Sequence, residues 1–236
     1  MADFGLEVIN SSGFVQIDST YKNLGLRAKG VVTSGGAPIG GVGWYYATVT
    51  ITAGASPVIA FRSSGKCYLR YSTASGGTIT YYFHCQGAGM QVWYWVFDDP
   101  VLATLSGNYG LSVSDGSGAV VFDSRTNYMR VIGAVSGAGA PGSDPIDAGF
   151  TGSYSGVPAV VQGQLRYQVI NTLVGGQPPN ATTVQNLLAV AVSFPGLSVT
   201  WRQENPASVT FNRQQNIDPS ISHLAYDYLV IDVSSM

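Results

Sequence analysis

The sequence predicts an all-β protein with two antiparallel, β-sandwich-like domains related by an internal repeat. Apolar residues recur at every second position in short runs rich in Val, Ile, Thr, Tyr and Phe, and clusters of Gly and Ser separate these runs. One 17-residue motif occurs twice. Because 45% of the 236 residues are hydrophobic, the chain can close a core, which argues against intrinsic disorder.

Ten segments have the period-two pattern of strands. They are residues 45–51, 56–61, 66–71, 78–84, 91–97, 119–123, 165–170, 198–202, 208–212 and 226–233. Only residues 182–192 compete for a helix, and their Val and Thr content leaves helix and strand both open.

The repeated motif covers residues 4–20 and returns at 109–125, with eight of the 17 positions identical. Each copy predicts a hairpin whose turn places Gly13 or Gly118 at positive φ. Two copies indicate two domains, residues 1–106 and 107–236. Residues 133–152 are rich in Gly and Pro and predict a loop or an extended arm that becomes ordered against a neighbouring subunit.

Cys67 and Cys85 flank a predicted hairpin with its turn at residues 75–77. If Gly76 is the centre, facing residues have numbers that sum to 152, so the two thiols are cross-strand neighbours within reach of a disulfide. Reduced, packed thiols are the preferred interpretation, because the cytosol keeps such pairs reduced.

Residues 91–97 read Gln-Val-Trp-Tyr-Trp-Val-Phe and are apolar on both faces of a strand. Such a strand is covered on both sides, either in the centre of a sandwich or at a contact between subunits; an aromatic platform for sugars is a third interpretation. The candidate contact aromatics are Trp44, Tyr45, Tyr46, Trp93 and Trp95.

The sequence offers no recognisable catalytic constellation, so we expect neither an enzyme nor a cofactor or metal site. His84 and His223 lie in unrelated contexts and predict a packed and a surface histidine, and no zinc-ligand spacing is present. A glycosidase pair formed by Asp98 or Asp99 with Glu204 stays a distant alternative. Asp144 and Asp147 match no calcium-binding pattern and predict solvated loop acids.

Charge is scarce, at 10% of residues against roughly a quarter in an ordinary domain. The net charge of −2 and the lack of a basic run argue against a nucleic-acid partner. The N-terminal residues do not have the pattern of a signal peptide, and no stretch approaches a membrane span, so we expect cytosolic synthesis and no membrane insertion.

The motifs resemble small structural proteins of tailed bacteriophages, which belong to the tail tip, the baseplate or the tail fibres. The resemblance rests on the first repeat (Phe4-Gly-Leu-x-Val, Gly13, Asp18-Ser19) and on residues 96–100, 109–113, 118, 121–124 and 128–131. It implies a non-enzymatic virion component, assembled in the host cytoplasm as a homo-oligomer with other tail proteins. The alternative is a receptor-binding or tail-fibre module that recognises a host-surface glycan; a hydrolase is a third hypothesis.

Overall fold

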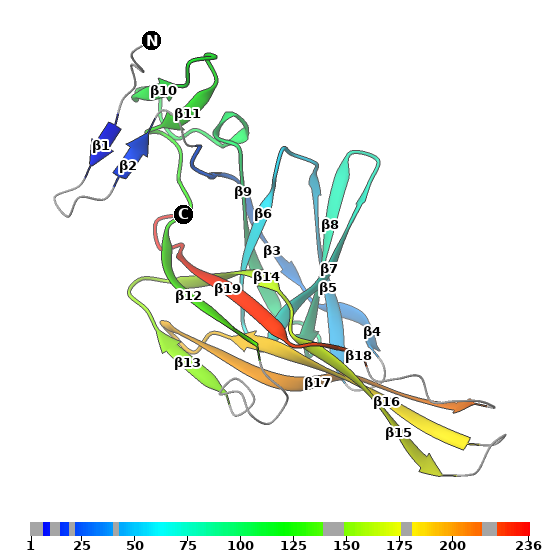
Figure 1. Ribbon diagram of the computed structural model, residues 1–236. Helices are drawn as coiled ribbons and strands as arrows, with labels where there is room; N and C mark the ends of the chain where they lie inside the picture. Colours follow the sequence, from blue (N-terminus) through cyan, green and yellow to red (C-terminus); the bar gives the residue numbers. More distant parts are fainter. Residues whose placement is uncertain are drawn as a thin grey trace.

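A computed structural model describes residues 7–9, 15–18, 22–39, 43–138, 149–175, 181–213 and 221–236. Within these ranges the elements are β-strands, apart from one short 3-10 helix, η1 (Pro100–Leu102). The prediction of an all-β fold with antiparallel, sandwich-like sheets is therefore confirmed (Figure 1).

In the described part of the chain, nine strands precede η1. They are β1 (Glu7–Ile9), β2 (Val15–Asp18), β3 (Gly25–Thr33), β4 (Gly35–Ile39), β5 (Trp44–Thr52), β6 (Val58–Ser63), β7 (Cys67–Ser75), β8 (Thr78–Gln86) and β9 (Gln91–Asp98). Ten strands follow it. They are β10 (Ser112–Ser114), β11 (Val120–Asp123), β12 (Val131–Ala138), β13 (Phe150–Ser153), β14 (Pro158–Gln164), β15 (Tyr167–Gly175), β16 (Ala181–Ser193), β17 (Ser198–Arg213), β18 (Ile221–His223) and β19 (Ala225–Asp232).

Two large sheets pack face to face. The six-stranded sheet has the order β12-β19-β14-β6-β9-β3, and the nine-stranded sheet has the order β13-β17-β16-β7-β8-β5-β4, with β15 and β18 added beside β16. The main core lies between the sheets and contains buried residues from both, such as Phe61 and Val230 of the first and Phe83 and Trp201 of the second.

The strand order shows that the internal repeat extends far beyond the hairpin motif. The six-stranded order reads the same from either end when β3, β9 and β6 are matched with β12, β19 and β14. The nine-stranded order does the same when β5, β8 and β7 are matched with β13, β17 and β16. The two halves meet at the antiparallel pairs β6–β14 and β7–β16, as an approximate two-fold axis requires.

The matched strands share details of pairing. A register shift interrupts β3–β9 between Leu26 and Ala28, and another interrupts β12–β19 at the matching place, between Val131 and Gly133. The boundary predicted near residue 106 lies between the two sets of strands. Both large sheets nevertheless continue across it, and the two halves share one main core instead of having one each.

The two copies of the sequence motif form hairpins of the same register outside the large sheets. Val8 pairs with Ile17 in β1–β2, Val113 pairs with Phe122 in β10–β11, and a register shift follows each of these pairs. Gly118 has a φ of 86°, as predicted, whereas Gly13 lies outside the described residues.

The aromatic strand β9 is central in its sheet, between β6 and β3, and both of its faces are covered. One face contributes Val92, Tyr94 and Val96 to the main core, and the other packs Trp93, Trp95 and Phe97 into a second cluster on the outer side of the sheet. The interpretation of residues 91–97 as a central strand of a sandwich is therefore the one that the structure confirms.

Several segment predictions are revised. Residues 182–192 belong to strand β16, and residues 198–202 and 208–212 lie in the single long strand β17. The Gly- and Pro-rich stretch 133–152 is largely strand where it is described, in β12 and β13, and residues 139–148 lie outside the described residues. Glycine serves close packing here, because a Cβ atom at Gly133 would lie 2.5 Å from the ring of Tyr154, and one at Gly137 2.4 Å from the hydroxyl of Tyr226.

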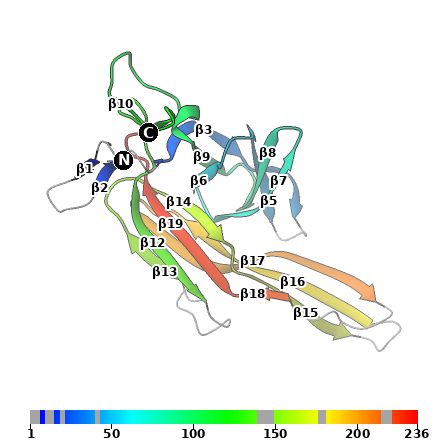
Figure 2. The ribbon, with the colours of Figure 1, turned by 45° about the horizontal axis from the view of Figure 1, so that its top comes forward.

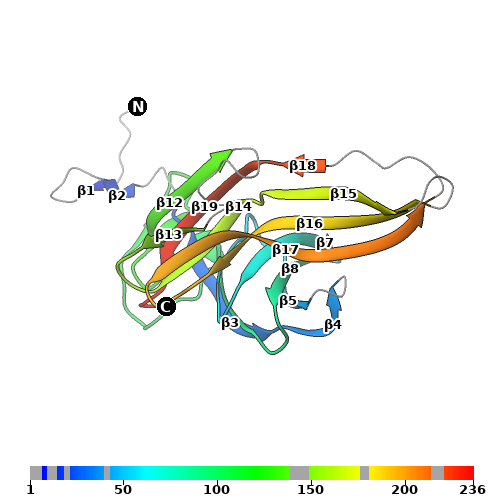
Figure 3. The same cartoon turned by 90° about the horizontal axis from the view of Figure 1, so that it is seen from below.

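Strands farther along the chain form an extended arm. β15, β16 and β17 run out beyond the other strands of both sheets, as all three ribbon views show (Figures 1, 2 and 3). At about 3.3 Å per residue, the 13 residues of β16 span about 43 Å and the 16 residues of β17 about 53 Å. We define the arm as residues 170–175, 181–186 and 206–213.

Candidate functional site

The predicted contact aromatics divide into core and surface. Trp44 and Trp95 are only 2% and 8% exposed, so neither ring is free for a partner, and this corrects their assignment as contact residues. Tyr45 and Trp93 are half-buried, and Tyr46 is 39% exposed. Among the five candidates, Tyr46 therefore presents the most accessible ring.

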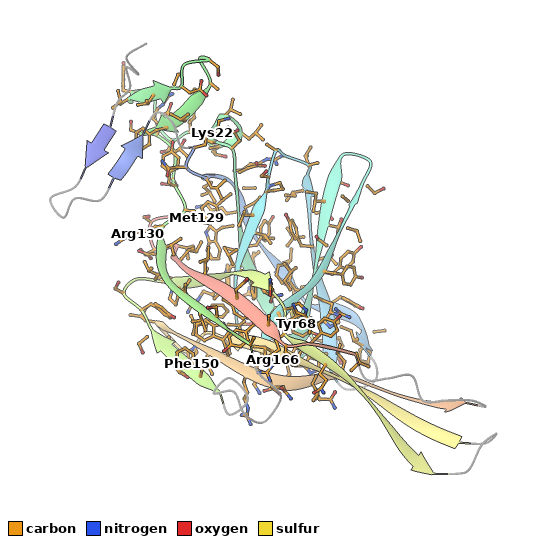
Figure 4. All side chains as sticks on the ribbon, viewed as in Figure 1. Lys22, Tyr68, Met129, Arg130, Phe150 and Arg166 are labelled. Atoms are coloured by element: carbon orange, nitrogen blue, oxygen red, sulfur yellow. The ribbon has the colours of Figure 1, made fainter. Side chains whose placement is uncertain are left out.

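Trp44 instead helps to join the two halves of the molecule. It packs with Tyr68, Ala189 and Ala191 in a cluster on the outer side of the nine-stranded sheet, where β7 of the first half meets β16 of the second. Figure 4 labels Tyr68 at this junction. Arg166, which the figure also labels, contacts β16 because its carbonyl oxygen accepts a hydrogen bond from the Val190 amide.

An aromatic row crosses the outer side of the nine-stranded sheet. The row consists of Tyr71 on β7, Tyr82 on β8 and Tyr46 on β5. The rings of Tyr71 and Tyr82 are stacked, with centroids 4.5 Å apart, and Tyr46 meets Tyr82 edge-on at 6.4 Å. Tyr71 is 44% exposed, so the row offers ring surface at both of its ends.

His84 lies beneath this row and is a packed side chain, 3% exposed. Its Nδ1 atom is 2.7 Å from the hydroxyl oxygen of Tyr68, and its ring meets the Tyr46 ring edge-on at 4.8 Å. Burial, together with the positive charge of Arg70, lowers the pKa of His84 to about 4. The imidazole is therefore neutral near pH 7 and has a structural part in the sheet.

An open groove of about 390 Å³ adjoins the end of the row at Tyr71. Arg70, Tyr71, Tyr167 and His223 line it, coming from β7, β15 and β18. The guanidinium carbon of Arg70 lies 5.4 Å from the centre of the Tyr167 ring, and His223 stacks on the same ring at 6.1 Å. A cation and an imidazole thus flank one aromatic ring.

A side chain from the six-stranded sheet fixes one wall of this groove. The Gln162 side-chain amide donates to the carbonyl oxygen of Leu69, and its oxygen accepts from the Leu69 amide. This pair of bonds holds β7 next to the register shift between Leu69 and Tyr71, which turns Arg70 and Tyr71 toward the groove wall. The groove is therefore built on ordered strands.

The cysteines face each other as predicted. Cys67 pairs with Cys85 across β7–β8, both are buried, and the structure has them as two thiols with sulfur atoms 3.4 Å apart. Burial raises the pKa of Cys67 well above its ordinary value. Nearer the turn, Tyr71 pairs with Tyr82 and not with Tyr81, because a two-residue turn offsets the pairing by one position. The register shift between Leu69 and Tyr71 removes this offset, so the predicted pairing holds at Cys67 and Cys85.

The other groups considered for chemistry lie in separate structural contacts. Asp98 pairs with Arg27, and Asp99 pairs with Lys22. Glu204 lies on β17 and binds Lys66, 2.5 Å away. In the described part of the chain, no three His, Cys, Asp or Glu side chains are grouped as metal ligands. Asp144 and Asp147 lie outside the described residues.

Comparison with known proteins adds no relative. No protein-family model, curated protein or solved structure matches the chain. Within the residues that the structure describes, no helix is long and apolar enough to cross a membrane.

Proposed function

We propose that the protein is a non-enzymatic structural component of a bacteriophage virion, in the tail tip or baseplate, and that it acts through contacts between subunits. The resemblance of the sequence motifs supports the class of protein, a phage structural protein. The arm is the structural observation that supports a function in assembly. The proposed partners are other tail proteins and further copies of the chain, and these would cover the arm.

The arm is suited to contacts with another chain because one of its edges is open. β13 pairs only with residues 198–201 of β17. Beyond Trp201, the edge of β17 that faces away from β16 has no strand partner among the described residues. An open edge presents unpaired backbone N–H and C=O groups, which are a template for a strand of a neighbouring subunit.

The second hairpin supports the same function. Tyr109 is 95% exposed and Leu111 is 54% exposed, beside the β10–β11 hairpin. Exposed large apolar side chains that lie close together are typical of surfaces that another chain covers. Both the arm and this hairpin thus provide surface for assembly.

Hydrogen exchange of the free chain and of the chain in assembled particles tests the proposal. We expect those amides of residues 206–213 that face away from β16 to exchange at least 100-fold more slowly in the assembly, because a neighbouring chain covers the open edge of β17. The amides of β9, which is central in its sheet, serve as the internal control and stay protected in both states. Equal exchange of residues 206–213 in the two states would contradict an assembly function of the arm.

A second candidate function is recognition of a host-surface carbohydrate. The groove and the adjoining aromatic row favour it, since they combine exposed ring faces with polar side chains on a rigid sheet.

A further inference from the structure

We propose that the groove between β7, β15 and β18 binds a saccharide that carries a carboxylate, and that Arg70 is the partner of this carboxylate. The proposal rests on the second candidate function, carbohydrate recognition, and names its ligand class. It is independent of the part that the arm plays in assembly.

Arg70 has no carboxylate partner among the described residues, unlike five other basic side chains. Arg70 is a half-buried residue, yet no carboxylate of the described residues pairs with it. Five other basic side chains have a carboxylate oxygen within 3.3 Å. They are Lys22, Arg27, Lys66, Arg125 and Arg130. Since a partly desolvated charge is unfavourable without a counter-charge, the groove is prepared for an anion.

The geometry of Arg70 favours a planar anion. The guanidinium carbon of Arg70 lies over the ring of Tyr167, 5.4 Å from its centre. The planar fork of N–H donors of an arginine matches the two oxygens of a carboxylate. A carboxylate bound edge-on would lie within the groove that Arg70 lines.

The remaining lining fits a sugar ring. Tyr71 offers an exposed ring face for the apolar C–H side of a sugar, and Ser72, Gln164 and His223 provide polar groups for its hydroxyls. From Tyr71 the aromatic row continues through Tyr82 to Tyr46, so a linear oligosaccharide has further rings to contact across β8 and β5.

The positive charge of the groove is too small for a polyphosphate such as a nucleic acid and favours a saccharide with single carboxylates. A nucleic-acid site needs several Lys and Arg side chains to replace the counterions of successive phosphates. The groove lining contains Arg70 as its only Lys or Arg, with His223 beside it. One cation matches one carboxylate on a sugar unit.

Binding of the full-length protein to defined polysaccharides tests the proposal. The probes are polygalacturonate, hyaluronan and polysialic acid, each intact and with its carboxylates reduced to alcohols, and dextran as a neutral polymer. We expect at least one intact acidic polymer to bind at least tenfold more tightly than its reduced form and than dextran. This comparison uses the unaltered protein, so it does not depend on the folding of a variant.

Variants of the groove locate the binding. Arg70→Gln should weaken binding of the acidic polymer at least tenfold, and Arg70→Lys should weaken it less, because it keeps the charge and loses the planar fork. Arg202→Gln removes a 60% exposed arginine side chain on β17; as the matched control, it should bind like the unaltered protein.

The outcomes separate the ligand class from the function. Equal binding of intact and reduced polymers, or full binding by Arg70→Gln, would overturn the carboxylate assignment and leave carbohydrate recognition standing. No binding of any polymer would overturn both.

Discussion

Asp98 connects three segments of the chain through one fully buried side chain. Its carboxylate lies 3.0 Å from the Arg27 guanidinium and accepts hydrogen bonds from the backbone amides of Ser56 and Asp99. Asp232, at the matching end of β19, likewise accepts from the amide that precedes β14. At the residue scale, the repeat is therefore held by a pair of equivalent carboxylates that end equivalent strands.

We expect Asp98→Ala to lower the free energy of unfolding by about 3 to 5 kcal/mol, because it leaves a mostly buried arginine and two backbone amides without their acceptor. Asp98→Asn keeps an acceptor oxygen and should have a smaller effect. Asp99→Ala is the matched control: its ion pair with Lys22 is more exposed, and the loss should be about 1 kcal/mol. Denaturant unfolding measures all three, and equal losses at positions 98 and 99 would contradict the assignment.

His84 predicts a pH dependence of stability. Its pKa falls from 6.5 to about 4 on folding, so between these values the unfolded chain binds a proton that the folded chain does not. Stability is therefore complete above pH 6.5 and is lost as the pH falls toward 4, by at most about 3 kcal/mol. Unfolding of His84→Gln between pH 6.5 and 4.5 should show a flatter dependence; an unchanged slope would assign the effect to other groups.

At the scale of elements, the β10–β11 turn depends on one glycine and not on its neighbour. Gly118 has a φ of 86°, whereas Gly116 lies outside the left-handed region, and a Cβ atom would meet no neighbour at either position. We expect Gly118→Ala to destabilise the hairpin by about 1 to 2 kcal/mol and Gly116→Ala to have almost no effect. Local hydrogen exchange of residues 112–123 measures both, and similar losses would indicate that the turn does not require a positive φ.

Strands with an alternating pattern could be predicted from the sequence, and elements shaped by distant contacts could not. The two faces of β9 follow from local alternation, as does the opposition of Cys67 and Cys85. Glycines at positions 133 and 137 make room for tyrosine rings, and this need is not visible in the local sequence. The local sequence of β16 leaves helix and strand both open, and its antiparallel pairing with β17 fixes it as a strand.

The groove illustrates the same limit for the site. Arg70 and Tyr167 are 97 residues apart in the sequence, and His223 follows 56 residues after Tyr167, so no local motif joins them. A cluster of aromatics in the sequence does not distinguish a contact surface from a core, and Trp44 is buried against the other half of the molecule. The alternation of Tyr82 and His84 on β8 was the one local signal for the aromatic row.

At the scale of the whole molecule, two similar sandwich halves are joined edge to edge. The pairs β6–β14 and β7–β16 make both sheets continuous, so neither half exposes those edges. The second half adds the arm, which projects from one side of the molecule and breaks the approximate two-fold symmetry (Figure 3). In the proposed assembly, the projecting arm is suited to a repeated contact with neighbouring chains.

Quantitative mass spectrometry of purified phage particles that encode this chain tests the central claim most directly. A structural component of the tail tip or baseplate should be present in every preparation, at a fixed small-integer ratio to a tail protein of known copy number. Absence of the chain from intact, infectious particles would contradict the proposed function.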